Sequence, residues 1–191
     1  MKNVFFLFLF AMLVMSCGSE KQAVDTSSKD FKTRVDDRDR AVRDNLPKVG
    51  KLMPMFRETS ADGKIWTNHD IEGRLSVFYL WYQGSIQALG EMGELSSWKV
   101  MYPDVQFFSV TWHDVGTALR IANERHFTWT QLCNARQMMT WVSQGVDEKN
   151  ASARDYPVTI VVDQQGFVRR CVSGTSMEIR QETLNCIRQY R

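Results

Sequence analysis

The sequence has little excess charge of either sign. Its 24 Lys and Arg residues are balanced by 22 Asp and Glu residues, and the two kinds are mixed along the whole chain. No segment forms the basic face that binds a phosphate backbone, so the charge pattern excludes nucleic acid as an expected partner. The chain also has no internal repeat and no low-complexity tract, which excludes a repeat architecture.

Histidine is scarce as well. The three histidines, His69, His113 and His126, are scattered along the chain, and none of them has the spacing of paired metal ligands. A zinc or copper site is therefore not expected. No other cofactor is expected either.

The longest apolar run lies near the start of the sequence, at residues 4–15, and follows a lysine. It is shorter than the about 20 residues of a membrane span, so the pattern is that of an export signal. Its ending, Val14-Met15-Ser16-Cys17, resembles the bacterial lipobox. The resemblance implies a lipoprotein signal peptide at residues 1–16 and a lipid on Cys17 that anchors the protein to a membrane of the bacterial cell envelope, on the extracytoplasmic (periplasmic) side. A plain cleaved signal and an uncleaved anchor are the alternatives.

The segment that follows, residues 17–47, has few large apolar residues and dense charge of both signs. Such a composition cannot bury a core, so we expect a charged, flexible tether. The remainder, residues 48–191, has the length of one globular domain, since single domains run roughly 100–200 residues.

Within this domain, strand patterns and helix patterns alternate. Strands are expected at 64–68, 75–82, 105–112 and 158–163, with 167–172 completing a hairpin after the last of these. Helices are expected at 89–101, 115–125, 135–142 and 177–189, the second of them with Asp114 as its N-cap. This order predicts an α/β fold in which helices flank a mixed central sheet.

Four segments in this order carry a resemblance to a known family. They are GKLMPMF at 50–56, ADGKIWTNHDIEGRLSVFYLW at 61–81, GEMGEL at 90–95 and YPVTIVVDQQGFV at 156–168. Together they resemble the thioredoxin-like superfamily, and within it the TlpA/ResA-type envelope thiol-disulfide oxidoreductases. The resemblance covers residues 49–191 and implies a thioredoxin fold for the domain.

The redox motif of that family is missing. In the family the central strand ends in Trp-Cys-x-x-Cys, and a helix with Glu-Met-Pro-Glu-Leu follows. Aligning that helix with residues 91–95 places the two cysteine positions at Ser85 and Ala88 and the tryptophan position at Gly84. Disulfide exchange and Cys-based peroxidase chemistry both begin with a thiolate, which neither residue supplies. The resemblance therefore implies a degenerate site with no intact catalytic residue.

Three other cysteines remain after Cys17. Cys133 follows a strand-like segment at 128–132 and is expected to be a small buried hydrophobe. Cys171 lies in the hairpin and Cys186 in the last helix, which pack together in the resembling fold, so either a disulfide or two buried thiols would fit them. A redox role for one of the three would make the chain a thiol-disulfide oxidoreductase of cell redox homeostasis, which is the alternative function.

Ser85 also suggests a hydrolase. In the resembling fold, His113 and Asp114 lie at the same edge of the sheet as Ser85, and these residue types suit a base-assisted nucleophile. Asp114 is equally explained as a helix cap. A serine hydrolase is therefore a minor alternative.

The remaining interpretation is binding. The resemblance implies a cis peptide bond before Pro157, in a turn that presents backbone groups to a peptide in active relatives. Aromatic residues, which are favoured at interfaces, are expected near the same edge. The candidates for a binding surface are Trp81, Tyr82, Gln83, Gly84, Glu91, Trp112, Tyr156 and Pro157. The sequence thus predicts a membrane-tethered, non-catalytic module that binds an envelope protein or peptide.

Overall fold

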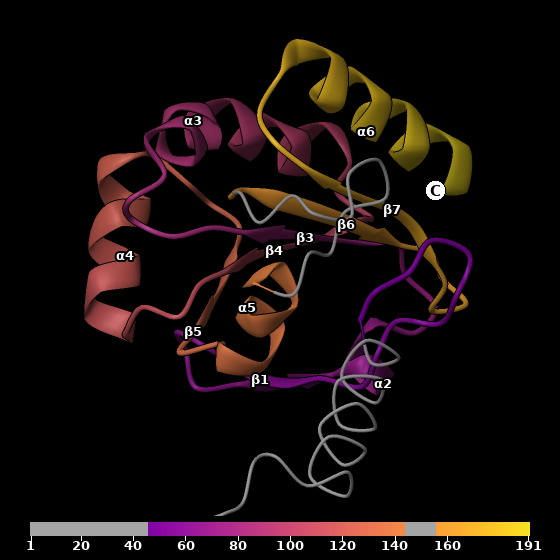
Figure 1. Cartoon of the computed structure of the whole chain (residues 1–191), viewed down its shortest axis with the longest axis horizontal. Helices are drawn as coiled ribbons and strands as arrows, with labels where there is room; N and C mark the ends of the chain where they lie inside the picture. Colours follow the sequence, from indigo (N-terminus) through magenta and orange to yellow (C-terminus); the bar gives the residue numbers. More distant parts are fainter. Residues whose placement is uncertain (1–45, 144–155) are drawn as a thin grey trace, which may run out of the picture. The chain divides into compact units, whose positions relative to one another are not determined.

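The computed structural model of the chain describes residues 46–143 and 156–191. The predicted signal peptide, Cys17 and nearly all of the predicted tether lie outside the described residues. The described residues form a seven-stranded mixed sheet in the order β2-β1-β5-β4-β3-β6-β7 (Figure 1). Its strands are β1 (Arg57–Ser60), β2 (Ile65–Thr67), β3 (Ser76–Leu80), β4 (Gln106–Val110), β5 (Thr130–Cys133), β6 (Val158–Val162) and β7 (Val168–Ser173). The helices are α2 (Asn68–Ile71), α3 (Ile86–Met101), α4 (Val115–Glu124), α5 (Arg136–Ser143) and α6 (Met177–Tyr190).

Strand β3 lies in the interior of the sheet, because it pairs in parallel with β4 and antiparallel with β6. All five of its residues are buried, and its side chains alternate between two hydrophobic cores. Phe78 and Leu80 belong to one core, whereas Val77 and Tyr79 belong to the other. A strand covered on both faces needs apolar residues at nearly every position, which explains its continuous apolar run.

The helices cover both faces of the sheet. Residues of α3, α4 and α6 belong to the core that contains Tyr79, whereas residues of α2 and α5 belong to the core that contains Phe78. Figure 1 shows α3 and α6 on one side of the sheet and α5 on the other. Strands β3 and β4 are parallel, so α3 and α4 begin at the same edge of the sheet, where the candidate site lies.

The elements expected from the sequence are present, with differences at their ends. Helix α3 begins at Ile86, earlier than expected, because the Ser85 side chain caps it by accepting a hydrogen bond from the backbone N–H of Ala88 (3.3 Å). Asp114 caps α4 as expected, through the backbone N–H of Thr117. The strand-like segment at 128–132 corresponds to β5.

Two short elements were not expected, β1 and α2. Their sequences, RETS and NHDI, contain one apolar residue between them, so neither shows a hydrophobic period. Strand β1 forms because it pairs with both β2 and β5. Strand β2 is short and β5 is distant in the sequence, so the sequence pattern alone does not reveal these pairings.

Candidate functional site

The turn after β3 is built around a glycine. The backbone N–H of Ser85 donates to the carbonyl oxygen of Tyr82 (3.0 Å), which closes the turn. A Cβ atom on Gly84 would collide with the aromatic ring of Tyr82. Glycine therefore allows the Tyr82 ring to lie against the turn, at the position where the resembling family has a tryptophan.

Ser85 is held in place by two hydrogen bonds. Its hydroxyl caps α3, as described above, and donates to the carbonyl oxygen of Tyr156 (3.0 Å). The Tyr156-Pro157 peptide bond is cis. The side chain of Ser85 is 9% exposed, and Ala88, at the second cysteine position, is fully buried. Both positions thus have roles in packing and hydrogen bonding, and neither presents a nucleophile to solvent.

Three aromatic rings gather beside this turn, and we call them the aromatic cluster: Tyr82, Trp112 and Tyr156. Their ring centroids lie 4.9 Å (Tyr82 to Tyr156), 5.7 Å (Tyr82 to Trp112) and 5.8 Å (Trp112 to Tyr156) apart. Trp112 is 43% exposed, and the two tyrosines are half-buried. Burial raises the pKa of Tyr156 to about 12, so its hydroxyl stays protonated and donates to the backbone carbonyl of Met139 (3.3 Å).

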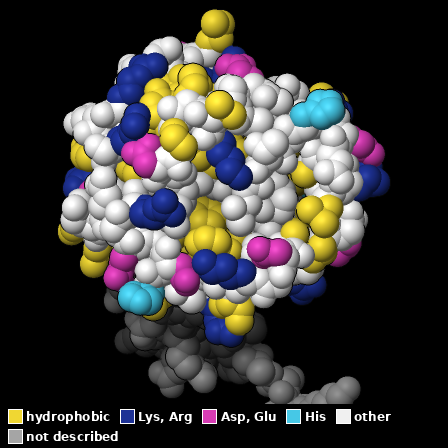
Figure 2. Space-filling model, turned by 180° about the vertical axis from the view of Figure 1, so that it is seen from behind, with side chains coloured by type: hydrophobic (Ala, Val, Ile, Leu, Met, Phe, Trp, Pro, Cys, Tyr) yellow, Lys and Arg dark blue, Asp and Glu magenta, His cyan; other side chains and the backbone are white. Residues whose placement is uncertain are grey.

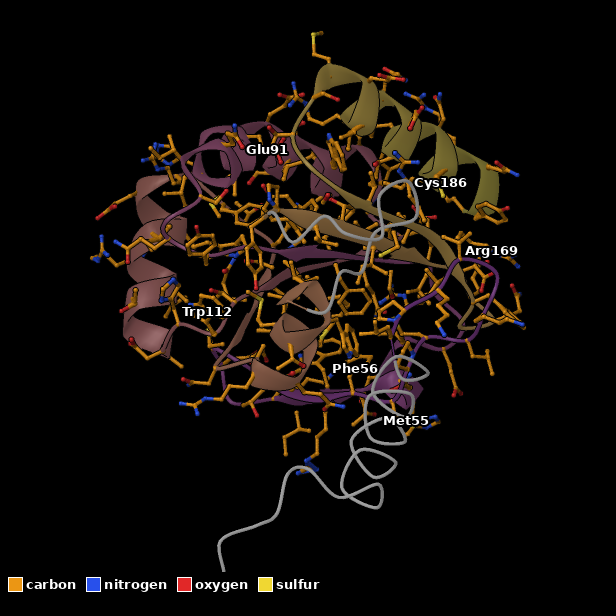
Figure 3. The ribbon with its side chains drawn as sticks, in the orientation of Figure 1. Met55, Phe56, Glu91, Trp112, Arg169 and Cys186 are labelled. Atoms are coloured by element: carbon orange, nitrogen blue, oxygen red, sulfur yellow. The ribbon has the colours of Figure 1, made fainter. Side chains whose placement is uncertain are left out.

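An open pocket of about 430 Å³ adjoins the aromatic cluster. Trp112 forms one wall, and Arg136, Met139 and Thr140 of α5 line the rest of what the structure describes. Figure 3 shows Trp112 beside α4, at the edge of the sheet where the candidate site lies. Of the described residues that line it, Trp112 and Met139 are apolar and Arg136 carries a guanidinium group.

Three of the residues expected at the binding surface, Trp81, Glu91 and Pro157, are buried, and those predictions were wrong. Trp81 continues the alternation of β3 into the core under α3 and is 0% exposed, and its indole N–H donates to the hydroxyl of Ser109 (2.8 Å). Glu91 lies one turn after Ala88, on the buried stripe of α3, and is 6% exposed. The strand and helix periods place the side chains of Trp81 and Glu91 inward.

Glu91 is the buried end of a hydrogen-bond network between α3 and its neighbours (Figure 3). It accepts a hydrogen bond from the hydroxyl of Tyr79 (2.7 Å) and pairs with the guanidinium of Arg180 from α6 (3.1 Å). Arg180 also pairs with Glu94 (3.3 Å), which is exposed. Burial raises the pKa of Glu91, although the bonds from Tyr79 and Arg180 oppose that rise.

The structure does not assemble a serine hydrolase at Ser85. The Nε2 atom of His113 accepts a hydrogen bond from the backbone N–H of Gln83 (3.0 Å), so that nitrogen is already used, and the Ser85 hydroxyl donates to Tyr156 instead. Asp114 is engaged by the backbone and hydroxyl of Thr117. Burial lowers the pKa of His113. No Ser-His-Asp hydrogen-bond relay links these three residues in the described part of the chain.

Comparison with protein-family models and with curated proteins finds no significant match. Comparison with solved structures finds many. A proposed protein disulfide isomerase from Bacteroides thetaiotaomicron superposes with a TM-score of 0.64 at 13% identity, over 76% of this chain and 91% of that chain. The chain has the thioredoxin fold.

Two further structures with this thioredoxin fold carry related names. A proposed thiol:disulfide interchange protein DsbE from Chlorobium tepidum matches with a TM-score of 0.63 at 14% identity, over 75% of this chain and 98% of that chain. A secreted disulfide oxidoreductase of Mycobacterium tuberculosis, homologous to DsbE of E. coli, matches with a TM-score of 0.55 at 16% identity, over 69% and 94%. The predicted α/β fold with a mixed sheet flanked by helices is confirmed.

None of the three described cysteines, Cys133, Cys171 and Cys186, belongs to the turn after β3. Cys133 is 3% exposed, and burial raises the pKa of its thiol to about 11, so the reactive thiolate is disfavoured at neutral pH. Cys171 and Cys186 do not form the disulfide that the sequence left open. The sheet separates them: Cys171 points into the core with α5, whereas Cys186, on α6, packs against the opposite core (Figure 3).

The described residues contain neither a metal-site cluster nor a membrane-spanning helix. Within 46–143 and 156–191, no three His, Cys, Asp or Glu side chains gather as a metal site would require. None of the helices in these ranges combines the length and the hydrophobicity that a bilayer crossing needs. On the face seen in Figure 2, basic and acidic side chains are interspersed, which agrees with the balanced charge of the sequence.

Sequence reasoning missed the part of the site that α5 contributes. Arg136, Met139 and Thr140 were expected only as helix residues, and the one visible signal was the amphipathic pattern of that segment. Ile86, the first residue of α3, was also missed, although its side chain is 83% exposed between Ser85 and Ala88. Gln83 and Gly84 are exposed at the turn, as expected, and Pro157 is buried behind it.

Proposed function

We propose that this chain is a membrane-tethered, extracytoplasmic protein that uses its thioredoxin fold to bind a peptide segment of an envelope protein, without thiol-disulfide exchange at the usual site. The observation that carries the proposal is the aromatic cluster, whose Trp112 is exposed beside the turn that ends at Ser85. By the resemblance, Ser85, the N-cap of α3, and Ala88, in its first turn, stand at the two cysteine positions. A binding surface accounts for both features, because it needs exposed aromatic groups and needs no thiolate.

The chemistry of the site supports binding over electron transfer. Ser85 cannot form a disulfide, and its hydroxyl already forms two hydrogen bonds. It donates to the carbonyl oxygen of Tyr156 and accepts from the backbone N–H of Ala88. The methyl group of Ala88 lies where a resolving thiol would be required, and it is fully buried. The raised pKa of Cys133 makes that buried thiol a poor replacement nucleophile.

The proposed location rests on the start of the sequence. The apolar run that ends in Ser16-Cys17 supports export and lipidation at Cys17. The charged segment at 17–47 would then act as the tether between the lipid and the domain. One of the structures that share the fold is described as secreted, which agrees with a role outside the cytoplasm.

The proposal is tested by binding and turnover measured on the same purified protein. We expect it to bind a subset of an array of peptides that tile the envelope proteins of its host, and to show no insulin reduction. Trp112→Ala should weaken peptide binding about tenfold or more, as truncation of an interface aromatic does. Val100→Ala is the matched control, since Val100 is also exposed but lies near the far end of α3.

Two results would contradict the proposal. Failure to bind any array peptide would remove the binding function. The second result is insulin reduction by the wild type that is lost in Cys133→Ser or Cys171→Ser. It would replace the binding function with the alternative function, a thiol-disulfide oxidoreductase.

A further inference from the structure

The pocket beside the aromatic cluster combines an apolar lining with one cation. Met139 is buried at its floor, Trp112 forms a wall, and the side chain of Arg136, the first residue of α5, is exposed at its rim. The volume of about 430 Å³ lies within the range of roughly 300–1,000 Å³ that is usual for ligand pockets. The pocket therefore has room for a large side chain and a charge beside it.

Arg136 is the charged residue among the described residues that line this pocket. In the described part of the chain, no carboxylate forms an ion pair with its guanidinium group. The carboxylates on adjoining elements are engaged elsewhere: Glu58 of β1 accepts a hydrogen bond from the backbone N–H of Met138 (3.1 Å), and Asp114 caps α4. Among the described residues, then, none supplies the negative charge that would complete the pocket, and a ligand can supply it.

We infer that the pocket selects an extended peptide segment in which an acidic residue follows a bulky apolar residue. The apolar side chain would lie against Trp112 and Met139, and the carboxylate would pair with Arg136. The contact between Tyr156 and α5 makes the pocket continuous with the aromatic cluster, because the Tyr156 hydroxyl donates to the carbonyl of Met139 (3.3 Å). This inference rests on the proposed function and names the class of peptide that the same surface recognises.

The arrangement also predicts what is rejected. An exposed ion pair is worth up to about 1 kcal/mol, or a factor of about five in affinity. A lysine in place of the acidic residue loses that pairing and adds repulsion with Arg136. Selection by charge should therefore exceed selection among apolar side chains of similar size.

The test uses hexapeptides of the form Gly-Ser-X-Z-Ser-Gly, acetylated and amidated at their ends, with X as Leu, Phe or Met and Z as Glu, Gln or Lys. Dissociation constants for the purified protein come from NMR titration, read at the indole N–H of Trp112. We expect Glu peptides to bind up to about five times more tightly than Gln peptides, and Lys peptides to bind most weakly. Arg136→Glu should reverse the order, so that Lys peptides bind more tightly than Glu peptides.

Arg125→Glu is the matched control, since it changes the net charge equally. Arg125 is exposed at the other end of α4 from Trp112, about 15 Å along a helix of 10 residues. It should leave the order of the peptides unchanged. Circular dichroism of both variants confirms that each is folded.

The outcomes separate the inference from the proposed function. If peptides shift the Trp112 signal but bind equally with Glu, Gln and Lys, or if Arg136→Glu leaves the order intact, the inference is wrong and the binding function stands. If a peptide with a free C-terminal carboxylate and no Glu binds more tightly than the capped Glu peptides, the pocket recognises the C-terminal carboxylate of a chain. The inference is then also wrong. If no hexapeptide and no array peptide binds, the proposed function fails and the inference fails with it.

Discussion

The hydroxyl of Ser85 donates a hydrogen bond of 3.0 Å to the carbonyl oxygen of Tyr156. This bond joins the start of α3 to the residue before the cis-proline, across two segments that are far apart in the sequence. A side chain at the first cysteine position thus connects the two walls of the site. Ser85 therefore has a structural role, because its hydroxyl connects the start of α3 to Tyr156.

Restoring both cysteines should restore disulfide chemistry. In Ser85→Cys/Ala88→Cys, the first thiol would lie at the N-terminus of α3, where a thiol pKa can fall from about 8.5 into a range of about 3.5–7.5. The second would lie in the buried position of Ala88. We expect an intramolecular disulfide by mass spectrometry and a gain of insulin reduction.

The single variant Ser85→Cys is the control for this experiment, and it should give a reactive thiol without an internal disulfide. A double variant that stays fully reduced in air, although folded, would show that the turn has lost the geometry of an oxidoreductase loop.

Glu91 should make stability depend on pH. Burial raises the pKa of Glu91 in the folded state above its ordinary value of 4.5. At a pH just above 4.5, Glu91 is therefore still protonated in the folded protein, whereas it has lost its proton in the unfolded chain. The free energy of unfolding contributed by this residue therefore falls as the pH rises from 4.5 through the folded pKa. Urea unfolding of the wild type and of Glu91→Gln from pH 4 to pH 8 measures the difference between their free energies of unfolding. As the pH rises, the wild type should lose stability relative to the variant. Glu94→Gln, at an exposed partner of Arg180, should show no such trend in that window.

Tyr79→Phe should destabilise the fold. Its one hydroxyl hydrogen is shared between the carboxylate of Glu91 (2.7 Å) and the carbonyl oxygen of Ala88 (3.1 Å), and both acceptors are buried. Leaving a buried acceptor unsatisfied costs about 1–3 kcal/mol. Chemical denaturation should show a loss of that size, whereas Tyr190→Phe, which keeps the ring that packs against Arg169, should change stability much less. Equal stability of the two variants would mean that the Glu91 network contributes nothing.

Gly84 and Tyr82 should be energetically coupled. A Cβ on Gly84 collides with the Tyr82 ring, so Gly84→Ala has to displace that ring from the aromatic cluster. Overpacking of this kind costs about 1–3 kcal/mol. In a Tyr82→Ala background the same change should cost almost nothing, and a double-mutant cycle from urea unfolding measures the coupling. Additive effects would show that the two residues do not contact each other in solution.

Cys133 should be inert in the folded protein. Its pKa of about 11 and its burial both suppress the thiolate. Iodoacetamide at pH 8, followed by peptide mass spectrometry, should modify Cys133 only after addition of urea. Cys186 serves as the internal comparison, because its side chain is more exposed and should be modified first. Rapid modification of Cys133 in the native protein would reopen the oxidoreductase alternative.

The parts of the structure that the sequence predicted are those with strong local signals. Continuous apolar runs predicted β3, β4 and β6, and Asp114 marked the start of α4 correctly. Strand β1 could not be predicted in the same way, because its pairing with β5 depends on residues more than half the domain away. Glu91 was named as a candidate for the binding surface, whereas its spacing of three residues from Ala88 places it on the buried stripe of α3.

The pocket shows why the rest of the site was missed. It forms where Trp112, after β4, meets Arg136 and Met139 of α5, and neither segment carries a motif by itself. The aromatic members of the site were found because aromatic residues at a sheet edge are conspicuous. The partners from α5 were not found because only tertiary packing brings them there.

The separation of Cys171 and Cys186 by the sheet has a consequence for how the protein responds to its surroundings. Within the described residues, the domain is held together without any covalent cross-link, so a reductant such as dithiothreitol has no bond to break and should leave the melting temperature unchanged. Among the described residues, no disulfide can alternate between an oxidised and a reduced form. The affinity of the domain for a ligand would then stay constant while the redox potential around it varies, as suits an adaptor and not a sensor.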